Sequence, residues 1–416
     1  MLSTMQNAFR IADLRRKILF TLAMLVVFRI GSFIPVPGID ASGLASKFGQ
    51  GNIFGLLDLF AGGSLRRFTI FAMGVNPYIT SSIIIQLLTI VIPSLEEMAK
   101  EGVEGRKKIQ QLTRYGTVLL AIIQGYGTVA YVREFIITPG FFTTATIILT
   151  LTAGTMFLMW LGEKISERGI GNGISLIIFA GIVARLPSSA LTTFQAIGAG
   201  GINPFAVVIF LILAVVVIAA VVLIQEGQRR IPVQYPKRVV GRKVYGGQST
   251  HIPLRVNQAG VIPVIFASSI LAVPATIGLF VPGLRFLDRW LGYNTFGYNF
   301  LYALFVVFFT YFYTAVTFNP MQIADNMKKY GGFIPGLRPG RPTAEYLERV
   351  LTRITLVGAL FLAAIAVLPS IATGVFGYGA FAFGSTSLLI MVGVALDTMK
   401  QIEAHLLMRH YEGFMK

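Results

Sequence analysis

Ten long apolar runs, separated by shorter polar stretches, dominate the hydrophobic pattern of the sequence. Each run holds 17 to 25 residues, and an α-helix of about 20 apolar residues crosses a hydrocarbon core of roughly 30 Å. The pattern predicts an all-α, polytopic membrane protein with about ten transmembrane helices. The runs cover residues 18–34, 69–92, 115–137, 142–161, 170–186, 204–225, 257–281, 299–318, 350–369 and 378–399.

Proline and glycine punctuate these runs and predict turns between helices. Composition agrees with the pattern, because 55% of the 416 residues are hydrophobic and only 13% are charged. Soluble domains carry roughly twice that charged fraction. The predicted turns lie at Pro93, Pro139-Gly140, Pro187, Pro282-Gly283 and Pro369.

The net charge of +17 is distributed unevenly between the two sides of the predicted membrane. Of the 35 lysines and arginines, 27 fall in the two termini and every second loop, and 7 fall in the opposite loops. Lysine and arginine are enriched in cytoplasmic loops of membrane proteins. Both termini are therefore predicted to be cytoplasmic, and the charge excess needs no nucleic-acid partner.

Ten spans divide into two sets of five at the connection near residues 187–203. An odd number of spans per set turns the second set upside down relative to the first. Inverted halves that meet on a central axis are a common way to build a membrane passage. We expect an N-terminal half over 1–187 and a C-terminal half over 188–416.

The interior of the predicted spans lacks the groups of an ion-coupled transporter or an enzyme. Their central portions hold no Asp, Glu or Lys, whereas coupled transporters normally need ionisable groups there. The chain has no cysteine, and its histidines, His251, His405 and His410, lie in a loop and the tail. The sequence predicts no catalytic constellation, no metal site and no cofactor.

One segment, 52–69, is too short and polar to span a bilayer, and it lies on the non-cytoplasmic side. It fits either a helix on the outer membrane surface or a re-entrant segment. A re-entrant segment is tolerated at depth only where it lines a cavity or packs in protein. The break at 61–64, Ala-Gly-Gly-Ser, would let the chain fold back. The pattern alone leaves both alternatives open.

Two long extramembrane loops, about 226–256 and 319–349, also lie on the cytoplasmic side. Loops of this length usually carry function or disorder. Residues 230–247 mix Val, Ile and Tyr with Gly and Pro, which predicts a short hairpin reaching into the cytosol. Fixing topology needs far fewer residues, so we favour a docking surface.

Eight motifs are spread over essentially the whole length of the chain. They are FRIGSFIP (28–35), PYITSSIIIQLL (77–88), FLMWLGE (157–163), RGIGNGI (168–174), GQSTHIPL (247–254), ADNMKK (324–329), IPGLRPG (334–340) and STSLLI (385–390). In these motifs and in their order the chain resembles the SecY family of bacterial protein-translocation channels.

The resemblance implies a channel whose waist is a ring of branched apolar side chains. Such a ring excludes water and ions by dewetting yet yields around a passing polypeptide. Two pairs of the implied residues are spaced i, i+4, so each pair shares one helix face. The ring residues would be Val75, Ile79, Ile174, Ile178, Ile265 and Ile390.

The resemblance also implies a plug at 52–69 and a lateral gate between the second and seventh helices. It therefore favours the re-entrant alternative for that segment. A few hydrogen bonds of about 1 kcal/mol each hold a gate shut while remaining breakable. The plug residues would be Phe54, Leu57, Phe60, Gly62, Gly63, Arg66 and Arg67, and the gate residues Thr80, Gln124 and Asn257.

The resemblance further implies that the two long loops dock a motor or a ribosome. The family's partners are the small membrane subunits SecE and SecG, the SecA ATPase, the ribosome, signal peptides and secretory polypeptides, within the lipid of the bacterial cytoplasmic membrane. The docking residues would be Arg229, Arg230, Lys237, Arg238, Arg242, Lys243 and Arg338.

Two functions remain in view. The first is a passive protein-conducting channel that moves secretory polypeptides across the membrane and releases membrane proteins sideways into it. The alternative is a secondary transporter of a small solute, which leaves the long basic loops unexplained and lacks a coupling residue.

Overall fold

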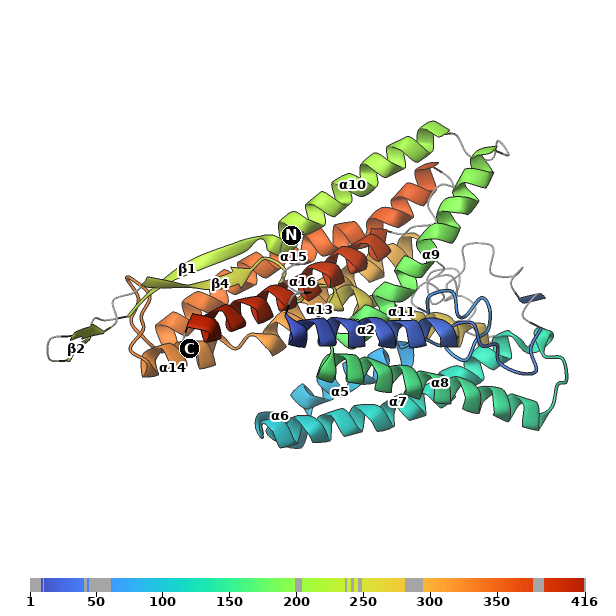
Figure 1. Cartoon of the computed structure of the whole chain (residues 1–416), viewed down its shortest axis with the longest axis horizontal. Helices are drawn as coiled ribbons and strands as arrows, with labels where there is room; N and C mark the ends of the chain where they lie inside the picture. The colour runs from blue at the N-terminus through green and yellow to red at the C-terminus, as the bar shows by residue number, and fades with distance from the viewer. Residues whose placement is uncertain are drawn as a thin grey trace.

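The computed structural model describes most of the chain. Its long helices run roughly along one direction (Figure 1). The described residues are 9, 11–40, 43–44, 61–198, 204–235, 238–240, 243–245, 249–280, 295–376 and 385–414.

Ten helices of 16 residues or more occur in the described part of the chain, and each overlaps one of the ten apolar runs. The all-α fold predicted from the pattern is confirmed. The helices are α2 (Ala12–Gly31), α5 (Asn76–Val91), α7 (Val103–Tyr131), α8 (Phe141–Arg168), α9 (Gly173–Gly198), α10 (Pro204–Glu226), α11 (Ile262–Phe280), α13 (Phe296–Thr317), α15 (Arg341–Phe376) and α16 (Ser385–Phe414).

By length and apolar composition alone, five helices within the described ranges are able to cross a membrane, or six if α5 and α6 (Pro93–Lys100) form one bent span. These two helices meet at an angle of 101°. The bend follows from Pro93, because proline disfavours the helical conformation of the preceding residue, and Ile92 is indeed extended. The turn predicted at Pro93 is confirmed.

Three predicted boundaries are wrong. The run that begins at 69 becomes helical only at Asn76, since residues 61–75 form consecutive turns and Gly74 adopts a φ of +57°. Helices α9 and α15 continue through Pro187 and Pro369. Proline is tolerated inside membrane helices where neighbouring groups satisfy the freed carbonyl. The predicted division at 187 therefore falls within α9.

The helices form two groups that follow the order of the chain (Figure 1). In the first group α8 contacts α2, α5, α7 and α9, and in the second α13 contacts α11 and α15 while α10 contacts α16. The groups meet where α11 touches α5 and α7 and where α16 touches α9. The seam between them is the centre of the molecule.

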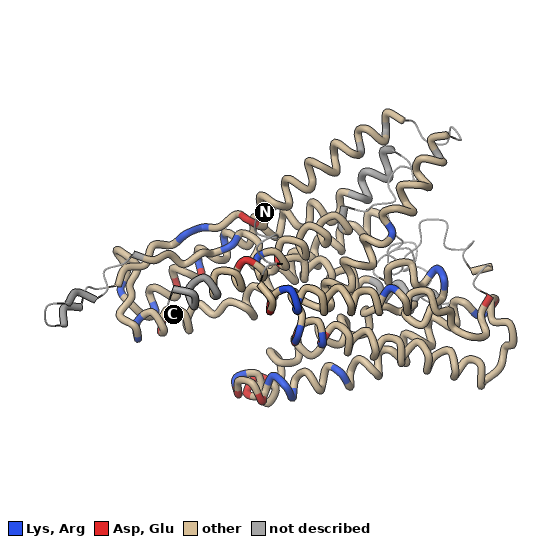
Figure 2. Tube along the Cα trace, in the orientation of Figure 1, with Lys and Arg blue, Asp and Glu red and all other residues tan. Residues whose placement is uncertain are grey.

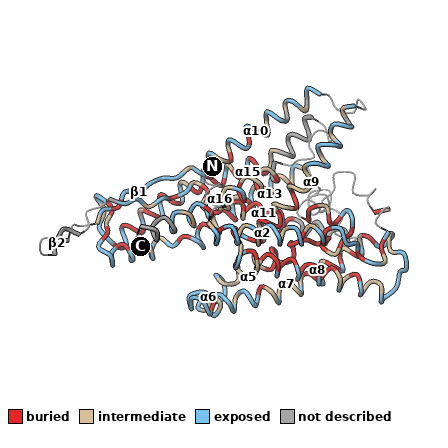
Figure 3. The backbone as a smooth tube through the Cα atoms, in the orientation of Figure 1, coloured by how far each residue is buried: buried red, intermediate tan, exposed pale blue. Residues whose placement is uncertain are grey.

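Exposed residues lie along the outside of the bundle (Figure 3), and many of them are large and apolar, such as Leu149 and Val215. Helix α10 is the extreme case, because only 12% of its apolar window is buried. In water such a surface would be unstable, whereas in lipid it is expected. The exposure pattern is that of a membrane protein.

The predicted hairpin is confirmed. Strand β1 (Gln228–Gln234) pairs antiparallel with β4 (Ser249–Arg255), and β2 (Arg238–Val240) pairs with β3 (Lys243–Tyr245). This ribbon projects beyond the helices at the end of the molecule that also holds α14 (Pro320–Lys329) (Figure 1). Many Lys and Arg residues lie at the same end (Figure 2), as the predicted topology requires.

Two smaller elements shape the opposite end. A 3-10 turn, η1 (Arg133–Phe135), follows α7. Isolated bridges join Pro35 to Thr69 and Ile39 to Ile136. The first bridge joins the segment after α2 to the turns that precede α5, and the second joins it to the segment after α7.

Candidate functional site

The six residues predicted to form the ring are supplied by helices of both groups, and the ring itself stays a prediction. All six belong to one hydrophobic cluster or pack against it, and they are supplied by α5, α9, α11 and α16, with Val75 directly before α5. Five are buried, and Ile174 is partly buried. Because α5 contacts α11 and α9 contacts α16, both helix groups contribute to this apolar centre.

The start of α9 is fixed by polar contacts, and it places two of these residues. Asn172 Oδ1 accepts a hydrogen bond from the Ser175 backbone N–H at 3.1 Å, as a helix N-cap does. The Gly173 N–H donates to Ser166 Oγ of α8 at 2.9 Å. Ile174 and Ile178 follow on one face of this anchored helix.

The predicted plug is described only in part, because Phe54, Leu57 and Phe60 lie outside the described residues. Gly62 and Gly63 adopt φ angles of +67° and +86°, which glycine tolerates without steric cost. A Cβ on Gly62 would lie 2.7 Å from the Cα of Gly181 in α9. The chain therefore turns here in direct backbone contact with α9.

Arginine side chains connect this turn to the end of α2. Arg29 Nη1 lies 3.5 Å from the carbonyl oxygen of Gly62. The guanidinium groups of Arg29 and Arg67 lie 4.7 Å and 4.6 Å from the ring centroid of Phe33, within the range of a cation–π contact. Arg66 and Arg67 are exposed, in agreement with a position on the outer side.

The three residues predicted at the lateral gate lie on the elements that meet across the seam. Thr80 is on α5, Gln124 on α7, and Asn257 precedes α11. Thr80 Oγ1 donates to the Asn76 carbonyl at 3.0 Å, and Asn257 Nδ2 donates to the Gly260 carbonyl at 2.9 Å. Both bonds are local, so the predicted polar cluster remains a prediction.

The two long cytoplasmic loops form one module. A single hydrophobic cluster contains Ile231 and Val233 of β1, Leu254 of β4, and Ile334 of the second loop. Gln234 and Phe333 exchange two backbone hydrogen bonds of 2.9 Å. No pattern in the sequence indicates that the loops touch, because 99 residues separate this pair along the chain.

The predicted docking residues are distributed over this module. Arg229 and Arg230 are exposed on β1, and Arg338 is exposed in the second loop. Arg338 also holds the loop, since its carbonyl accepts a 2.8 Å hydrogen bond from Thr343 Oγ1. Arg238 and Lys243 belong to β2 and β3, and Lys237 and Arg242 lie outside the described residues.

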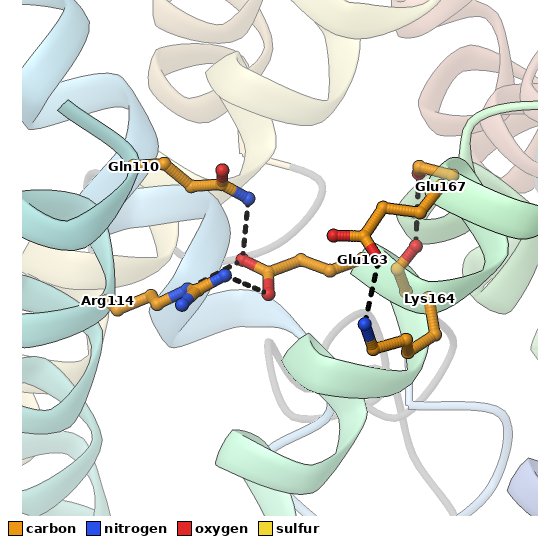
Figure 4. Close-up of polar contacts among 7 residues, drawn as sticks. Gln110, Arg114, Glu163, Lys164 and Glu167 are labelled. Carbon is orange, nitrogen blue, oxygen red and sulfur yellow. Dashed lines mark hydrogen bonds and ion pairs between the residues drawn. The ribbon is translucent and has the colours of Figure 1, made fainter. Parts of the chain in front are cut away.

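A set of polar ties in the first helix group was missed by the sequence reasoning. Glu163 of α8 accepts hydrogen bonds from Arg114 at 3.0 and 2.7 Å and from Gln110 at 2.9 Å, both on α7 (Figure 4). The bond to Glu163 raises the pKa of Arg114. Ser81 Oγ of α5 donates to the Thr113 carbonyl at 2.8 Å.

A cavity of about 430 Å³ lies between the helix groups near their cytoplasmic ends. Residues of α9, α11 and α16 line it, among them Ser175, Ile262 and Asp397. Beside it, Gln401 Oε1 of α16 accepts a hydrogen bond from the Gly171 N–H at 2.9 Å. This bond links the two groups directly across the seam.

These features define a polytopic helical membrane protein with an apolar centre between two helix groups and a basic cytoplasmic module. The SecY family model matches residues 69–399, which is more than half of the chain. The chain belongs to the SecY family.

Curated relatives match over the full length of both chains. The "Protein translocase subunit SecY" of Streptomyces galbus is 51% identical, that of Corynebacterium glutamicum 48%, and that of Mycobacterium tuberculosis 47%. In each case the match covers 100% of this chain and 100% of the relative. The resemblance inferred from the motifs is confirmed.

Solved structures share the fold at low identity. "The structure of a protein conducting channel" has a TM-score of 0.64 at 20% identity, covering 94% of this chain and 92% of that one. A structure concerning the plug domain of SecY has a TM-score of 0.68 at 19% identity. Sec61 in a canine ribosome–channel complex has a TM-score of 0.63. Family and fold together define a multi-pass protein of the bacterial plasma membrane.

Proposed function

We propose that this chain is the pore subunit of a protein-conducting channel of the bacterial cytoplasmic membrane. Family membership supports this function over the small-solute transporter. The observation that carries it is one buried cluster to which both helix groups contribute; it contains Val75, Ile79, Ile178, Ile265 and Ile390, and Ile174 packs against it. The pore itself performs no chemical step, and its relatives are named as subunits of a translocase.

The proposed pore excludes water and ions when it is closed, and its side chains move aside when a polypeptide enters. Branched apolar side chains at a narrow waist leave no room for hydrated ions and offer water no hydrogen bonds, so the closed waist stays dry. A polypeptide entering between the helices displaces these side chains through rotamer changes. The turn at Gly62 and Gly63 lies against Gly181 of α9, the helix that carries Ile174 and Ile178.

The proposed lateral gate lies between α5 and α7 on one side and α11 on the other. We call α5 and α7 together the α5/α7 wall. Thr80, Gln124 and Asn257 line the gate, and an apolar signal sequence passes between the walls into lipid. A gate closed by packing and a few weak polar contacts opens at low energetic cost.

The proposed energy source is a cytoplasmic partner. The ribbon with Arg229 and Arg230, together with the loop that carries Arg338, presents a basic surface to the SecA motor or to a translating ribosome. One structural neighbour is a channel bound to a ribosome, which supports this assignment. SecE and SecG are the proposed small subunits against the lipid-facing helices.

The test uses the absence of cysteine from the chain. Ile178→Cys in the ring is compared with Val215→Cys on α10, whose side chain is 66% exposed. Each variant is reconstituted with its partners, and a secretory substrate carrying one cysteine is stalled midway. A disulfide only with Ile178→Cys supports the pore. Equal adducts at both positions, or an adduct only at Val215→Cys, contradict it.

A further inference from the structure

The α5/α7 wall is held together at one level of the bundle. Ser81 is buried and donates to the carbonyl of Thr113 at 2.8 Å. A Cβ on Gly116, one turn further along α7, would lie only 2.4 Å from Ser81 Oγ. The glycine is therefore needed for the close approach that this hydrogen bond requires. The two helices of the wall are joined as one unit at this level.

The same turn of α7 is tied to α8 by Glu163. Arg114 follows Thr113 directly, and its guanidinium contacts both carboxylate oxygens of Glu163. Gln110, one turn earlier, adds a third hydrogen bond to the same carboxylate (Figure 4). A bidentate guanidinium–carboxylate pair fixes the relative orientation of the two side chains and also strengthens their attraction. We call Gln110, Arg114 and Glu163 the α7–α8 clamp.

Burial separates the clamp from an ordinary surface ion pair. The Glu163 side chain is 9% exposed and that of Arg114 is 41% exposed. A carboxylate this buried needs its partners, because an unpaired buried charge is strongly unfavourable. The nearby Lys164–Glu167 pair, at 2.7 Å, joins residues within α8, and Glu167 is 54% exposed. Such exposed pairs contribute little.

Helix α8 in turn is fixed to the rest of its group. Thr21 of α2 accepts a hydrogen bond from the Ile170 N–H, just after α8, at 3.0 Å. Ser166 of α8 accepts from the Gly173 N–H at the start of α9. The clamp is thus a polar link between the α5/α7 wall and the body formed by α2, α8 and α9.

We propose that Glu163 is a positioning residue that holds the α5/α7 wall against α11 and thereby sets how readily the lateral gate opens. The claim about gate opening rests on the proposed function. The geometric claim, that Glu163 holds α7 against α8, does not. With the clamp intact, the wall moves only together with α8. Without it, α7 separates from α8 and the contact of the wall with α11 is less favoured.

The geometric part is tested without transport. Spin labels on Leu119→Cys of α7 and Leu149→Cys of α8, both well exposed, report the distance between the helices by electron–electron resonance. Glu163→Gln is expected to broaden and shift the distance distribution. Glu167→Gln is the matched control and leaves it unchanged. An identical distribution in Glu163→Gln and the unsubstituted chain would overturn the proposal.

The claim about gate opening is tested by a ratio of two transport rates. It is the rate for a substrate with a defective signal sequence divided by the rate for the intact substrate. Removing a closed-state contact shifts the gate towards opening by its differential free energy, and we expect Glu163→Gln to raise the ratio about tenfold. Glu167→Gln leaves the ratio unchanged. If Glu163→Gln lowers both transport rates together and leaves the ratio unchanged, its effect is merely structural, and that result contradicts the proposal.

Two further variants keep the test decisive if Glu163→Gln folds poorly. Gln110→Ala removes one hydrogen bond and leaves the ion pair, so it raises the ratio by a smaller factor. The double variant Arg114→Glu/Glu163→Arg exchanges the two charges and brings the ratio part of the way back to that of the unsubstituted chain. No rise with Gln110→Ala together with no restoration by the exchange would count against the clamp. If even the unsubstituted chain fails to transport the intact substrate, the proposed function fails instead.

Discussion

The two sides of the proposed gate are built from different interactions. The α5/α7 wall is joined by the buried Ser81–Thr113 hydrogen bond and tied to α8 through Glu163. Helix α11 is held to α13 through aromatic packing, in which Phe266 meets Phe309 edge-to-face at 5.8 Å. Hydrogen bonds fix both distance and orientation, whereas apolar contact is non-directional. The difference predicts that α11 slides when the gate opens and that the α5/α7 wall keeps its internal geometry.

The largest expected effect is on the apolar side. Phe309→Ala removes a fully buried ring that contacts four other phenylalanines, those at 266, 305, 308 and 312. A buried Phe→Ala substitution costs about 3–5 kcal/mol. The loss is measured as the decrease in the free energy of unfolding in mild detergent. Phe300 on the same helix is 61% exposed, so Phe300→Ala is the control. An equal loss of stability in both variants would contradict the packing described.

An intermediate effect is expected where the α5/α7 wall is tightest. Gly116→Ala forces a methyl group against Ser81 Oγ, so either the helices separate or the hydrogen bond to Thr113 breaks. Overpacking of this kind costs about 1–3 kcal/mol. Gly198→Ala, where a Cβ meets open space, is the control. Thermal unfolding midpoints of the two variants decide the question, and equal midpoints would mean that the helices are not closely apposed.

The smallest effect is expected for the hydrogen bond alone. Ser81→Ala removes the donor, while the Thr113 carbonyl keeps the hydroxyl of Thr117 at 2.7 Å. Because the acceptor is not left unpaired, the loss is at the low end for a buried hydrogen bond, about 0.5–1 kcal/mol. Thr146→Val, which removes an exposed bond within α8, provides the reference. A loss above that of Gly116→Ala would show that Ser81 has a further role.

The sequence was sufficient to find the helices but not their ends. All ten apolar runs coincide with helices, yet α7 begins at Val103, well before the predicted 115. Charged residues such as Arg106 and Lys107 continue the helix into water, where hydropathy carries no signal. Pro93 ends a helix and Pro187 does not. Residue type alone does not distinguish these outcomes, because neighbouring helices decide them.

The candidate site was predictable only where a motif carried it. The six apolar ring residues belong to one hydrophobic cluster or pack against it, but each alone is an ordinary membrane residue, and the ring itself stays a prediction. The clamp had no such signal. Glu163 and Arg114 are 49 residues apart, and only the packing of α7 on α8 brings them together. Contacts between distant segments depend on helix rotation, which apolar periodicity fixes poorly in a helix surrounded by lipid.

The length of α15 has a mechanical consequence. Its 36 residues span about 54 Å at 1.5 Å per residue, well beyond the roughly 30 Å hydrocarbon core. Its cytoplasmic end packs in the same cluster as β1 and β4, and its membrane portion contacts α13, which contacts α11. The helix therefore connects the ribbon mechanically to α13 and α11, and we expect a force on the ribbon to be transmitted into the bilayer to the side of the proposed gate that is predicted to slide.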